Sequence, residues 1–421
     1  MRIFCGCRSK KTSSDVIPST TKTPASTYHM SSSRRTSNAD LSPRGSSIVY
    51  SSAAASSSTD NNSYNKDSWK SSVSSRSSLA SLRASLPENP HVYDFKEIFT
   101  ATNKFLSAKY SSSSSSAAWR CVIRGDEVIV FQRKFRRAIE ATELRERLLV
   151  ICKSHHSSLI KLRGASMSGS YIYLVYDYVK GASLADCLKN PKNPNFTILS
   201  DWMSRITIAA DLAHGLEYIH NSTGLEKKFI HNHIKSTSII VTQSASLNAK
   251  ICHFGTAELC GETDSRSESD SKKSNSKFVK FEGTRGYMSP EFQATGIATQ
   301  KSDVYAFGVV ILEILSGEEP LKYRQDKGTF VRVSLIDTTR EAVVSGGVRR
   351  WMDRRLKDSF PEEVAEKLAR LGLECLEEDP EKRPDMSWVT SRISKLYLDS
   401  QSWTEKMGSL PPDFTASFAP R

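Results

Sequence analysis

The sequence predicts an α+β fold in which strands occupy the first part of an ordered region and helices occupy the rest. Two runs rich in β-branched and aromatic residues, 127–135 and 171–178, have the pattern of strands, and residues 141–153 between them have the apolar spacing of a helix. Further along the chain, helical apolar spacing returns in four segments, 201–220, 304–315, 361–375 and 386–398. We therefore expect a small β-rich part followed by a larger helical part.

The composition of residues 1–91 predicts a disordered extension. They are crowded with Ser and Thr, carry scattered Lys and Arg, and contain few large apolar residues. Such a composition buries too little apolar surface to offset the entropy of ordering the chain. Thr36 and Ser42 have the basic or proline neighbours that many kinases read, although a linker with chance matches explains them equally well. We expect an ordered domain over 92–398 and a tail over 399–421.

The extreme N-terminus differs from the rest of the extension. Cys5 and Cys7 stand next to two apolar residues and a basic cluster, which suits thioester acylation such as palmitoylation. Two acyl chains anchor firmly because each buried methylene contributes about 0.8 kcal/mol, and the basic residues add attraction to an anionic membrane surface. Arg2 excludes N-myristoylation, which requires glycine at that position. The sequence predicts attachment to the cytoplasmic face of the plasma membrane; an unmodified tail in the cytoplasm is the alternative.

The composition argues against several other classes of protein. A net charge of +13 is more often a solvated surface than a nucleic-acid site, so we expect no nucleic-acid binding. The eight cysteines are scattered without a C-x-x-C pair or zinc spacing, which is typical of a reduced intracellular chain without a metal site. The best apolar run, 305–315, is shorter than the ~20 residues that span a bilayer.

Two stretches carry the most specific motifs. One reads Gly283-Thr-Arg-Gly-Tyr-Met-Ser-Pro-Glu291, and the other reads Lys301-Ser-Asp303-Val-Tyr-Ala-Phe-Gly308, with Arg383-Pro384 further on. Together they resemble the end of the activation segment, the following buried helix and the buried ion-pair partner of protein kinases, most closely of plant receptor-like kinases. Residues 91–105 are similar to the lead-in of that family, and residues 329–342 and 351–361 are similar to LysM-type receptor kinases.

The resemblance implies a two-lobed kinase-like fold. It places a small β-sheet lobe with one helix over 92–176, a hinge over 177–181 and a larger, mainly helical lobe over 182–398. A polar, Ser-rich insertion over 261–277 stands in the place of the activation loop and is expected to be mobile.

The catalytic positions depart from the family pattern. Where an active kinase reads H-R-D-x-K-x-x-N, this chain reads His231-Asn-His-Ile-Lys-Ser-Thr-Ser238, and where it reads D-F-G, this chain reads His253-Phe-Gly255. The lysine that holds the ATP phosphates aligns with Phe131, and its glutamate partner aligns with Arg147. The glycines of the phosphate loop align with Ser111, Ser113 and Ser116. The degenerate catalytic positions are therefore Phe131, Arg147, His233, Ser238 and His253.

These changes predict the loss of magnesium binding and of phosphoryl transfer. Magnesium prefers hard oxygen ligands, whereas an imidazole is mostly neutral near pH 7 and supplies no anion. Losing one well-placed electrostatic group typically costs about 3 kcal/mol in the transition state. Zinc bound by His233, His253 and Cys252, or a nuclease role for the His-Asn-His triplet, has no supporting spacing. We expect no metal and no catalytic residue.

Other family positions are retained. The resemblance implies a purine slot at the hinge formed by Tyr176, Asp177 and Val179, so ATP binding without magnesium stays open. The positions that match the structural core of the family are His231, Lys235, Phe254, Gly255, Glu291, Asp303 and Arg383.

The sequence thus predicts a receptor-like cytoplasmic pseudokinase that acts as a signalling scaffold or allosteric partner of active receptor-like kinases at the membrane. The alternative is an active or weakly active serine/threonine kinase with relocated residues. Arg133 lies two residues beyond Phe131 on the same strand face, but it could replace the missing lysine only through a β-bulge.

Overall fold

The computed structural model describes residues 90–112, 116–136, 139–222, 229–243, 246–263, 283–326 and 329–408. All of them belong to one compact unit of the chain, residues 70–421. Several predictions fall outside the described residues, namely the extension up to residue 89 with its phosphorylation contexts, the acylation sites Cys5 and Cys7, Ser113, and the insertion beyond Thr263.

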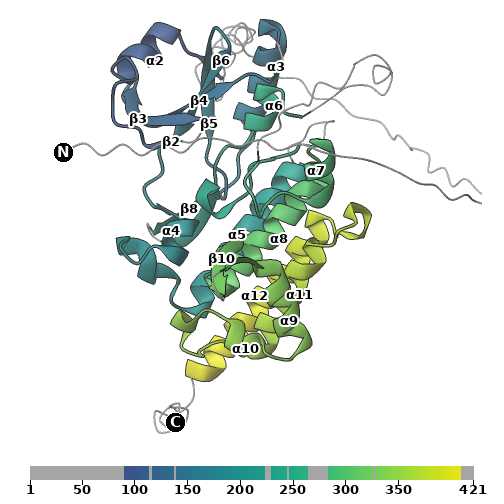
Figure 1. The fold of residues 1–421 in the computed structure, drawn as a ribbon. Helices are drawn as coiled ribbons and strands as arrows, with labels where there is room; N and C mark the ends of the chain where they lie inside the picture. Colours follow the sequence, from purple (N-terminus) through teal and green to yellow (C-terminus); the bar gives the residue numbers. More distant parts are fainter. Residues whose placement is uncertain are drawn as a thin grey trace, which may run out of the picture. The chain divides into compact units, whose positions relative to one another are not determined.

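The smaller lobe is built on a six-stranded sheet with strand order β1-β5-β6-β4-β3-β2 (Figure 1). The predicted strands are present as β4 and β6, each shifted by about one residue at its ends. Strands β3 and β4 are joined by Arg124 and Gly125, both at positive φ, as the tight turn of a hairpin requires. The strands are β1 His91–Val92, β2 Ser111–Ser112, β3 Ala117–Ile123, β4 Asp126–Lys134, β5 Leu162–Ser168 and β6 Tyr171–Asp177.

Two helices cover opposite faces of this sheet. Helix α3, Ala141–Lys153, has the predicted bounds and buries Leu144, Leu148 and Ile151, which recur on one helical face. Along β6 the side chains alternate: Ile172 and Leu174 pack in the cluster that contains α3, whereas Tyr173 packs in the cluster of α2.

The prediction of a single small-lobe helix was wrong, because helix α2, Phe95–Ala101, also packs on the sheet. Asp94 caps its N-terminus by accepting a hydrogen bond from the Lys96 backbone N–H. Ile98 is its one fully buried side chain, so the apolar pattern is too weak to reveal such a short helix.

The larger lobe is organised around helix α8, Gln300–Ser316, which is buried from Ser302 to Ser316. Helix α11 approaches it closely because both helices carry glycine at the contact. A Cβ on Gly308 would lie 2.8 Å from the Cβ of Cys375, and one on Gly372 would lie 2.9 Å from a Leu312 methyl. The helices of this lobe are α4 Leu184–Lys189, α5 Trp202–Glu217, α6 Thr256–Cys260, α7 Pro290–Thr295, α8, α9 Leu335–Val344, α10 Val348–Trp351, α11 Glu362–Cys375 and α12 Met386–Gly408. Short η elements are η1 Pro194–Leu199, η2 Tyr218–Ser222, η3 Ser236–Ser238, η4 Arg354–Leu356 and η5 Pro380–Lys382.

Helix α12 continues to Gly408, beyond the predicted end at Leu398. The additional turns pack on α5, since Ser400 is buried and its Oγ accepts a hydrogen bond from Trp202 Nε1 at 2.9 Å. The apolar spacing after Leu398 is too sparse to predict this continuation.

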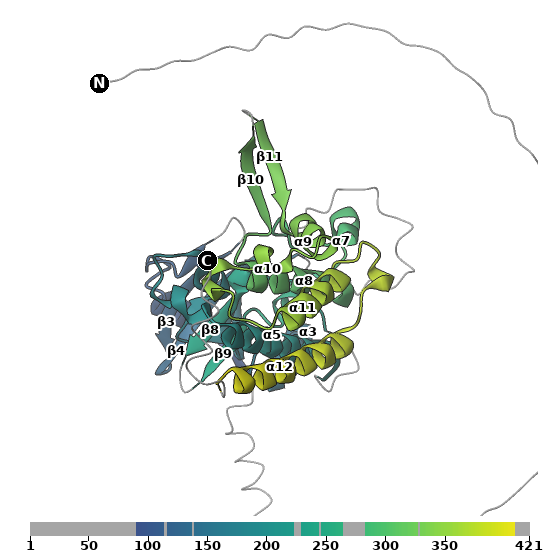
Figure 2. The same cartoon turned by 90° about the horizontal axis from the view of Figure 1, so that it is seen from below.

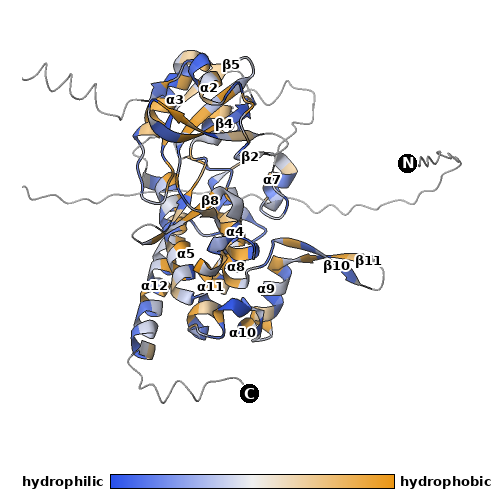
Figure 3. Ribbon diagram, turned by 90° about the vertical axis from the view of Figure 1, so that its left-hand side faces the viewer, coloured by the Kyte–Doolittle hydropathy of each residue, from blue (hydrophilic) through white to orange (hydrophobic). Residues whose placement is uncertain are grey.

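Two small sheets complete the lobe. Strands β7 Ala182–Ser183, β8 Ile239–Gln243 and β9 Leu247–Ile251 form one of them. The other is an antiparallel hairpin of β10 Leu321–Asp326 and β11 Thr329–Ser334, which projects away from the helices (Figure 2). Its residues are mixed in hydropathy (Figure 3), and Tyr323 and Phe330 are 63% and 73% exposed.

Within the described ranges, no helix combines the length and apolarity needed to cross a membrane. The six cysteines of these ranges carry free thiols.

Candidate functional site

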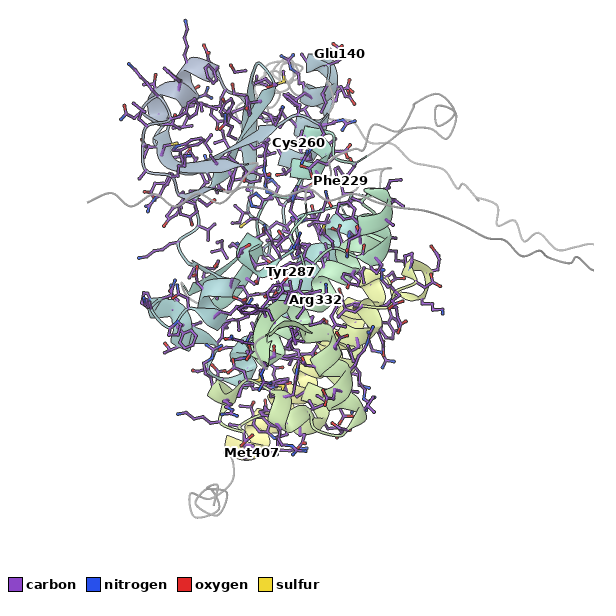
Figure 4. All side chains as sticks on the ribbon, in the orientation of Figure 1. Glu140, Phe229, Cys260, Tyr287, Arg332 and Met407 are labelled. Atoms are coloured by element: carbon purple, nitrogen blue, oxygen red, sulfur yellow. The ribbon has the colours of Figure 1, made fainter. Side chains whose placement is uncertain are left out.

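The candidate site is a cavity of about 570 Å³ between strand β4 and the upper part of the larger lobe. Tyr287, labelled in Figure 4, is one of the residues that line it. Four segments supply the lining: strand β4 with Phe131 and Arg133, the loop 232–238, the turn that contains His253 together with Glu262, and the segment 283–292.

The loop 231–233 is held by Asp303 from helix α8. The two carboxylate oxygens of Asp303 accept hydrogen bonds from the backbone N–H groups of His231 and Asn232, each at 2.7 Å. His220 Nε2 lies 3.1 Å from the same carboxylate. Although burial raises the pKa of Asp303, its hydrogen bonds with His220 and with the backbone N–H of His231 bring it below its usual value. A buried carboxylate therefore fixes the backbone at the positions that align with the catalytic loop.

His231 connects this loop to the turn at 252–255. Burial lowers the pKa of His231 to about 4, so its ring is neutral near pH 7. Its Nδ1 accepts from the His233 backbone N–H at 3.2 Å, and its Nε2 donates to the Cys252 carbonyl at 2.8 Å. The tautomer that these contacts require carries its proton on Nε2.

The structure also brings Glu291 and Arg383 together. The carboxylate and the guanidinium form two parallel contacts of 2.7 Å, and the Arg383 side chain is fully buried. Such a bidentate pair fixes both orientation and distance, and here it ties helix α7 to the segment before α12.

Phe131, which the motif spacing aligns with the missing lysine, makes apolar contacts. Its ring lies 4.5 Å from the ring of His253 and 5.8 Å from that of Tyr176, both in edge-on geometry. Strands β4 and β6 pair residue for residue from Val128 to Lys134, without a bulge. The strand shift that would move Arg133 into the lysine position is therefore absent.

The residues of the predicted purine slot lie together, but the space between them is nearly filled. Tyr176, Asp177 and Val179 line a cavity of about 30 Å³, with Phe131 and His253 on its other side. Ligand pockets usually offer about 300 Å³ or more. The buried Tyr176 hydroxyl donates to the Phe254 carbonyl at 2.8 Å, which fixes the ring at the inner end of the slot.

Arg147 makes an ion pair with a different element. One of its nitrogens lies 2.9 Å from Glu258 Oε1 and another contacts Glu143, one turn earlier on α3. It also donates to the Glu258 carbonyl at 2.7 Å. An arginine at this position therefore joins α3 to α6, where the family pattern has a lysine–glutamate pair joining α3 to the sheet.

His233 and Ser238 lie in the loop 232–238, and one carboxylate, that of Glu262, contacts His233. His233 Nε2 is 3.0 Å from Glu262 Oε2, and Asn232 donates to the same oxygen at 3.0 Å. Burial raises the pKa of Glu262, but the charges of His233 and Arg133 and the hydrogen bonds outweigh this effect and lower it to about 2. Ser238 is buried, and its backbone bonds to Lys235 and Cys252.

His253 occupies a strained turn. It adopts a left-handed conformation with φ of 67°, which is unusual for a residue with a side chain. Gly255 follows at φ of 82°, where a Cβ would lie 2.6 Å from an Ile151 methyl, so glycine is required there. Burial and the nearby charges of Arg133 and His233 lower the pKa of His253 well below its usual range, so the ring is neutral. Phe254 is buried and packs edge-on against Phe229.

The three histidines of the site do not form a metal centre in the part of the chain that the structure describes. Ring centroids of His231 and His233 are 6.3 Å apart, and those of His233 and His253 are 6.1 Å apart. Among the described residues, no group of three or more His, Cys, Asp or Glu side chains has the geometry to hold a metal ion.

Comparison with known proteins identifies the family of this chain. A family model described as the protein kinase domain matches residues 116–392. The chain belongs to the protein kinase family.

Its relatives include plant receptor-like kinases, as the motifs over 283–317 predict. The chain is 32% identical over 326 residues to LysM domain receptor-like kinase 3 of Arabidopsis thaliana, which covers 75% of this chain and 48% of that protein. It is 32% identical over 279 residues to PTI1-like tyrosine-protein kinase 1 of the same plant, covering 64% of this chain and 72% of the relative. The chain spans about half the length of the LysM-type relatives that it matches.

A solved structure supports the two-lobed kinase fold. The pseudokinase domain of BIR2, described as an immune regulator of the RLK/Pelle family, superposes with a TM-score of 0.57 at 23% identity. The match covers 81% of this chain and 98% of that domain. Because the identity is only 23%, the match establishes the fold alone. The predicted α+β kinase-like architecture is confirmed.

Sequence reasoning missed three residues of this kinase domain. Glu258 pairs with Arg147, Glu262 contacts His233, and His220 contacts Asp303. The charge reversal at Arg147 was a usable signal, because a buried arginine requires an acid nearby and Glu258 and Glu262 closely follow the His-Phe-Gly turn.

Proposed function

We propose that this kinase domain is catalytically inactive and works as a signalling scaffold that binds active receptor-like kinases. The observation that carries the proposal is the contact between Phe131 and His253. It joins the position of the ATP-binding lysine to the position of the magnesium-binding aspartate through two uncharged rings.

The chemistry of phosphoryl transfer supports this conclusion. Catalysis depends on charges set against the phosphates and on metal ions that neutralise them. At the four positions that carry lysine, glutamate and two aspartates in active kinases, this chain has Phe131, Arg147, His233 and His253. With each lost group worth about 3 kcal/mol in the transition state, turnover should fall by several orders of magnitude.

The retained framework supports a binding role. The Glu291–Arg383 pair and the Asp303 contacts hold the larger lobe in a fixed arrangement without any need for nucleotide. A fixed surface loses little entropy when a partner binds. Acylation at Cys5 and Cys7 would bring this surface to the membrane where receptor kinases act.

A phosphate-transfer assay tests the inactivity. The purified full chain is incubated with radiolabelled ATP, magnesium or manganese, and a generic protein substrate, beside an active receptor kinase domain as the control. We expect no transfer above background. Magnesium-dependent transfer that disappears in an Arg133→Ala variant would instead establish the alternative, a kinase with relocated residues.

A pull-down tests the scaffold. The full chain is presented to active receptor kinase domains, with Arg383→Ala as the variant that disrupts the larger lobe and Arg370→Ala as a control that removes an exposed arginine from α11. We expect binding by the native chain and by the control. Absence of binding to every kinase domain, together with no phosphorylation of the Ser-rich segments 31–85 and 262–276 in cells, would leave a vestigial protein as the better interpretation.

A further inference from the structure

We propose that the 570 Å³ cavity binds a phosphorylated serine or threonine on an extended peptide from another protein. The inference rests on the proposed function in one respect, namely that the cleft does not transfer phosphate. It adds a ligand class to a site that the family uses for catalysis.

The first argument is that two cations of the lining form no direct ion pair with an acid among the described residues. Arg133 makes no hydrogen bond or ion pair with any residue that the structure describes, and its Nε is buried. Lys235 bonds to a neutral hydroxyl, that of Thr284, at 3.1 Å. Both side chains line the same cavity. Both side chains are half-buried, and Glu262 is the acid whose carboxylate feels the charge of Arg133. An anion that enters between Arg133 and Lys235 is therefore attracted by both charges with less screening than in bulk water.

The second argument is an additional unsatisfied ring nitrogen, which donates in the tautomer that carries its proton on Nδ1. His253 Nδ1 is buried without a hydrogen-bond partner, although its ring lies at the wall of the cavity. Buried polar atoms in native proteins nearly always have a partner, and each exception needs an explanation. A phosphomonoester has three strong acceptor oxygens and a charge of about −1.5 to −2 at pH 7, so it can accept hydrogen bonds from Arg133, Lys235 and His253 together.

The position of the free space favours a peptide over a nucleotide. The purine slot retains only about 30 Å³, because Phe131 and Tyr176 fill it. The large cavity instead extends over the segment 283–292 of the larger lobe. An adenine ring would have to displace buried aromatic side chains, whereas a peptide on the 283–292 side would displace none of them.

The floor of this peptide side is rigid. Tyr287 donates to Glu313 of helix α8 at 2.8 Å, and Ser236 donates to the other carboxylate oxygen at 2.9 Å. Lys189 completes the set with an ion pair to Glu313. The segment is therefore fixed to the most buried helix of the domain, which lowers the entropy lost on binding.

Removing the charge of Glu262 should have the opposite effect on phosphopeptide affinity to removing the charge of Arg133. This carboxylate lies inside the cavity against His233 and Asn232, where it is an anion that competes with a phosphate for the same positive field. The second acid of the lining, Asp303, is already engaged by the backbone of the loop 231–232. Neutralising Glu262 should therefore strengthen phosphopeptide binding, while a variant that merely damages the fold would weaken it.

The experiment measures fluorescence polarisation of a labelled peptide of uncharged residues with one central phosphoserine, added to the full chain without nucleotide. The same peptide without phosphate, inorganic phosphate and ATP serve as comparison ligands. We expect the phosphopeptide to bind at least about tenfold more tightly than the unphosphorylated peptide, about tenfold more weakly to Arg133→Gln, and about threefold more tightly to Glu262→Gln. Arg370→Gln, which removes an exposed arginine outside the cavity, should bind like the native chain.

Several results would overturn the inference. Equal binding of both peptides would show that the protein does not recognise the phosphate. An unchanged affinity in a folded Arg133→Gln variant would show that the peptide does not bind in this cavity. Inorganic phosphate that binds where the peptide does not, or ATP that displaces the probe at micromolar concentration, assigns the cavity to a small ligand. Phosphate transfer in the separate radiolabel assay would refute the proposed function, whereas failed peptide binding without transfer would refute this inference alone.

Discussion

Reversing the charge of Arg147 should destabilise the domain, because the side chain holds helix α3 to helix α6. Arg147 Nη1 lies 2.9 Å from Glu258 Oε1, and the two side chains are 12% and 20% exposed. Removing one partner of a fully buried pair costs about 3–5 kcal/mol. Since water reaches part of both groups, we expect Arg147→Ala to lower the free energy of unfolding by about 2 kcal/mol.

The variant Arg147→Glu should be affected more, since it places a third carboxylate beside Glu143 and Glu258. A loss of about 3 kcal/mol corresponds to a fall in melting temperature of roughly 5 °C for a domain of this size. Thermal unfolding followed by circular dichroism measures this shift.

Two further variants make the reasoning falsifiable. Arg145→Glu changes the same charge on the exposed face of α3 and should leave the melting temperature nearly unchanged. Combining Arg147→Glu with Glu258→Arg should recover part of the loss, because an ion pair forms again in the opposite direction. Equal melting temperatures for Arg145→Glu and Arg147→Glu, or no recovery in the double variant, would refute the role of the pair.

Three other predictions concern location, acid sensitivity and packing. Cys5→Ser combined with Cys7→Ser should move the chain from the membrane fraction to the soluble fraction on cell fractionation, and an unchanged distribution would exclude acylation as the anchor. Burial lowers the pKa of His231 to about 4 from an ordinary value near 6.5, so the unfolded chain binds more protons between these pH values. Stability should therefore be complete above about pH 6.5 and fall by up to about 3 kcal/mol towards pH 4, and denaturant unfolding across this range should show a smaller slope in His231→Asn. Gly308→Ala should lower the unfolding free energy by about 1–3 kcal/mol, because the added Cβ meets Cys375 at 2.8 Å; unchanged stability by denaturant titration would mean that α8 and α11 separate easily.

The accuracy of the sequence predictions followed the strength of the local pattern. Helix α3 was predicted with correct bounds because its buried residues recur every three to four positions. Helix α2 was missed because seven residues with one fully buried side chain leave no such pattern. The hairpin of β10 and β11 was missed because large apolar side chains, Tyr323 and Phe330 among them, are exposed on it, so its sequence has no alternation between buried and exposed faces.

Some features of the candidate site could be predicted from the sequence and others could not. Fixed motif spacing located Phe131, His233 and His253, since each stands at a set distance from a recognisable neighbour. Spacing could not reveal that Glu258 faces Arg147, or that Tyr176 and Phe131 close the purine slot, because both depend on how separate elements pack. A sequence motif specifies which groups are available, and the tertiary fold decides which of them meet.

The projecting hairpin has a consequence for how the protein behaves in solution. It has two strands, so each retains an outer edge with unpaired backbone groups, which is the usual starting point for self-association. Lys322 is paired with Glu318, but Arg324 and Arg332 outweigh Asp326 and leave the hairpin with an excess of positive charge, so two copies repel one another at low ionic strength. At about 1 M salt the Debye length shrinks to about 3 Å, and this repulsion no longer opposes the apolar attraction between exposed aromatic side chains. The oligomeric state of the protein should therefore depend on salt, with monomers favoured in dilute buffer and edge-to-edge pairs accumulating as the salt concentration rises.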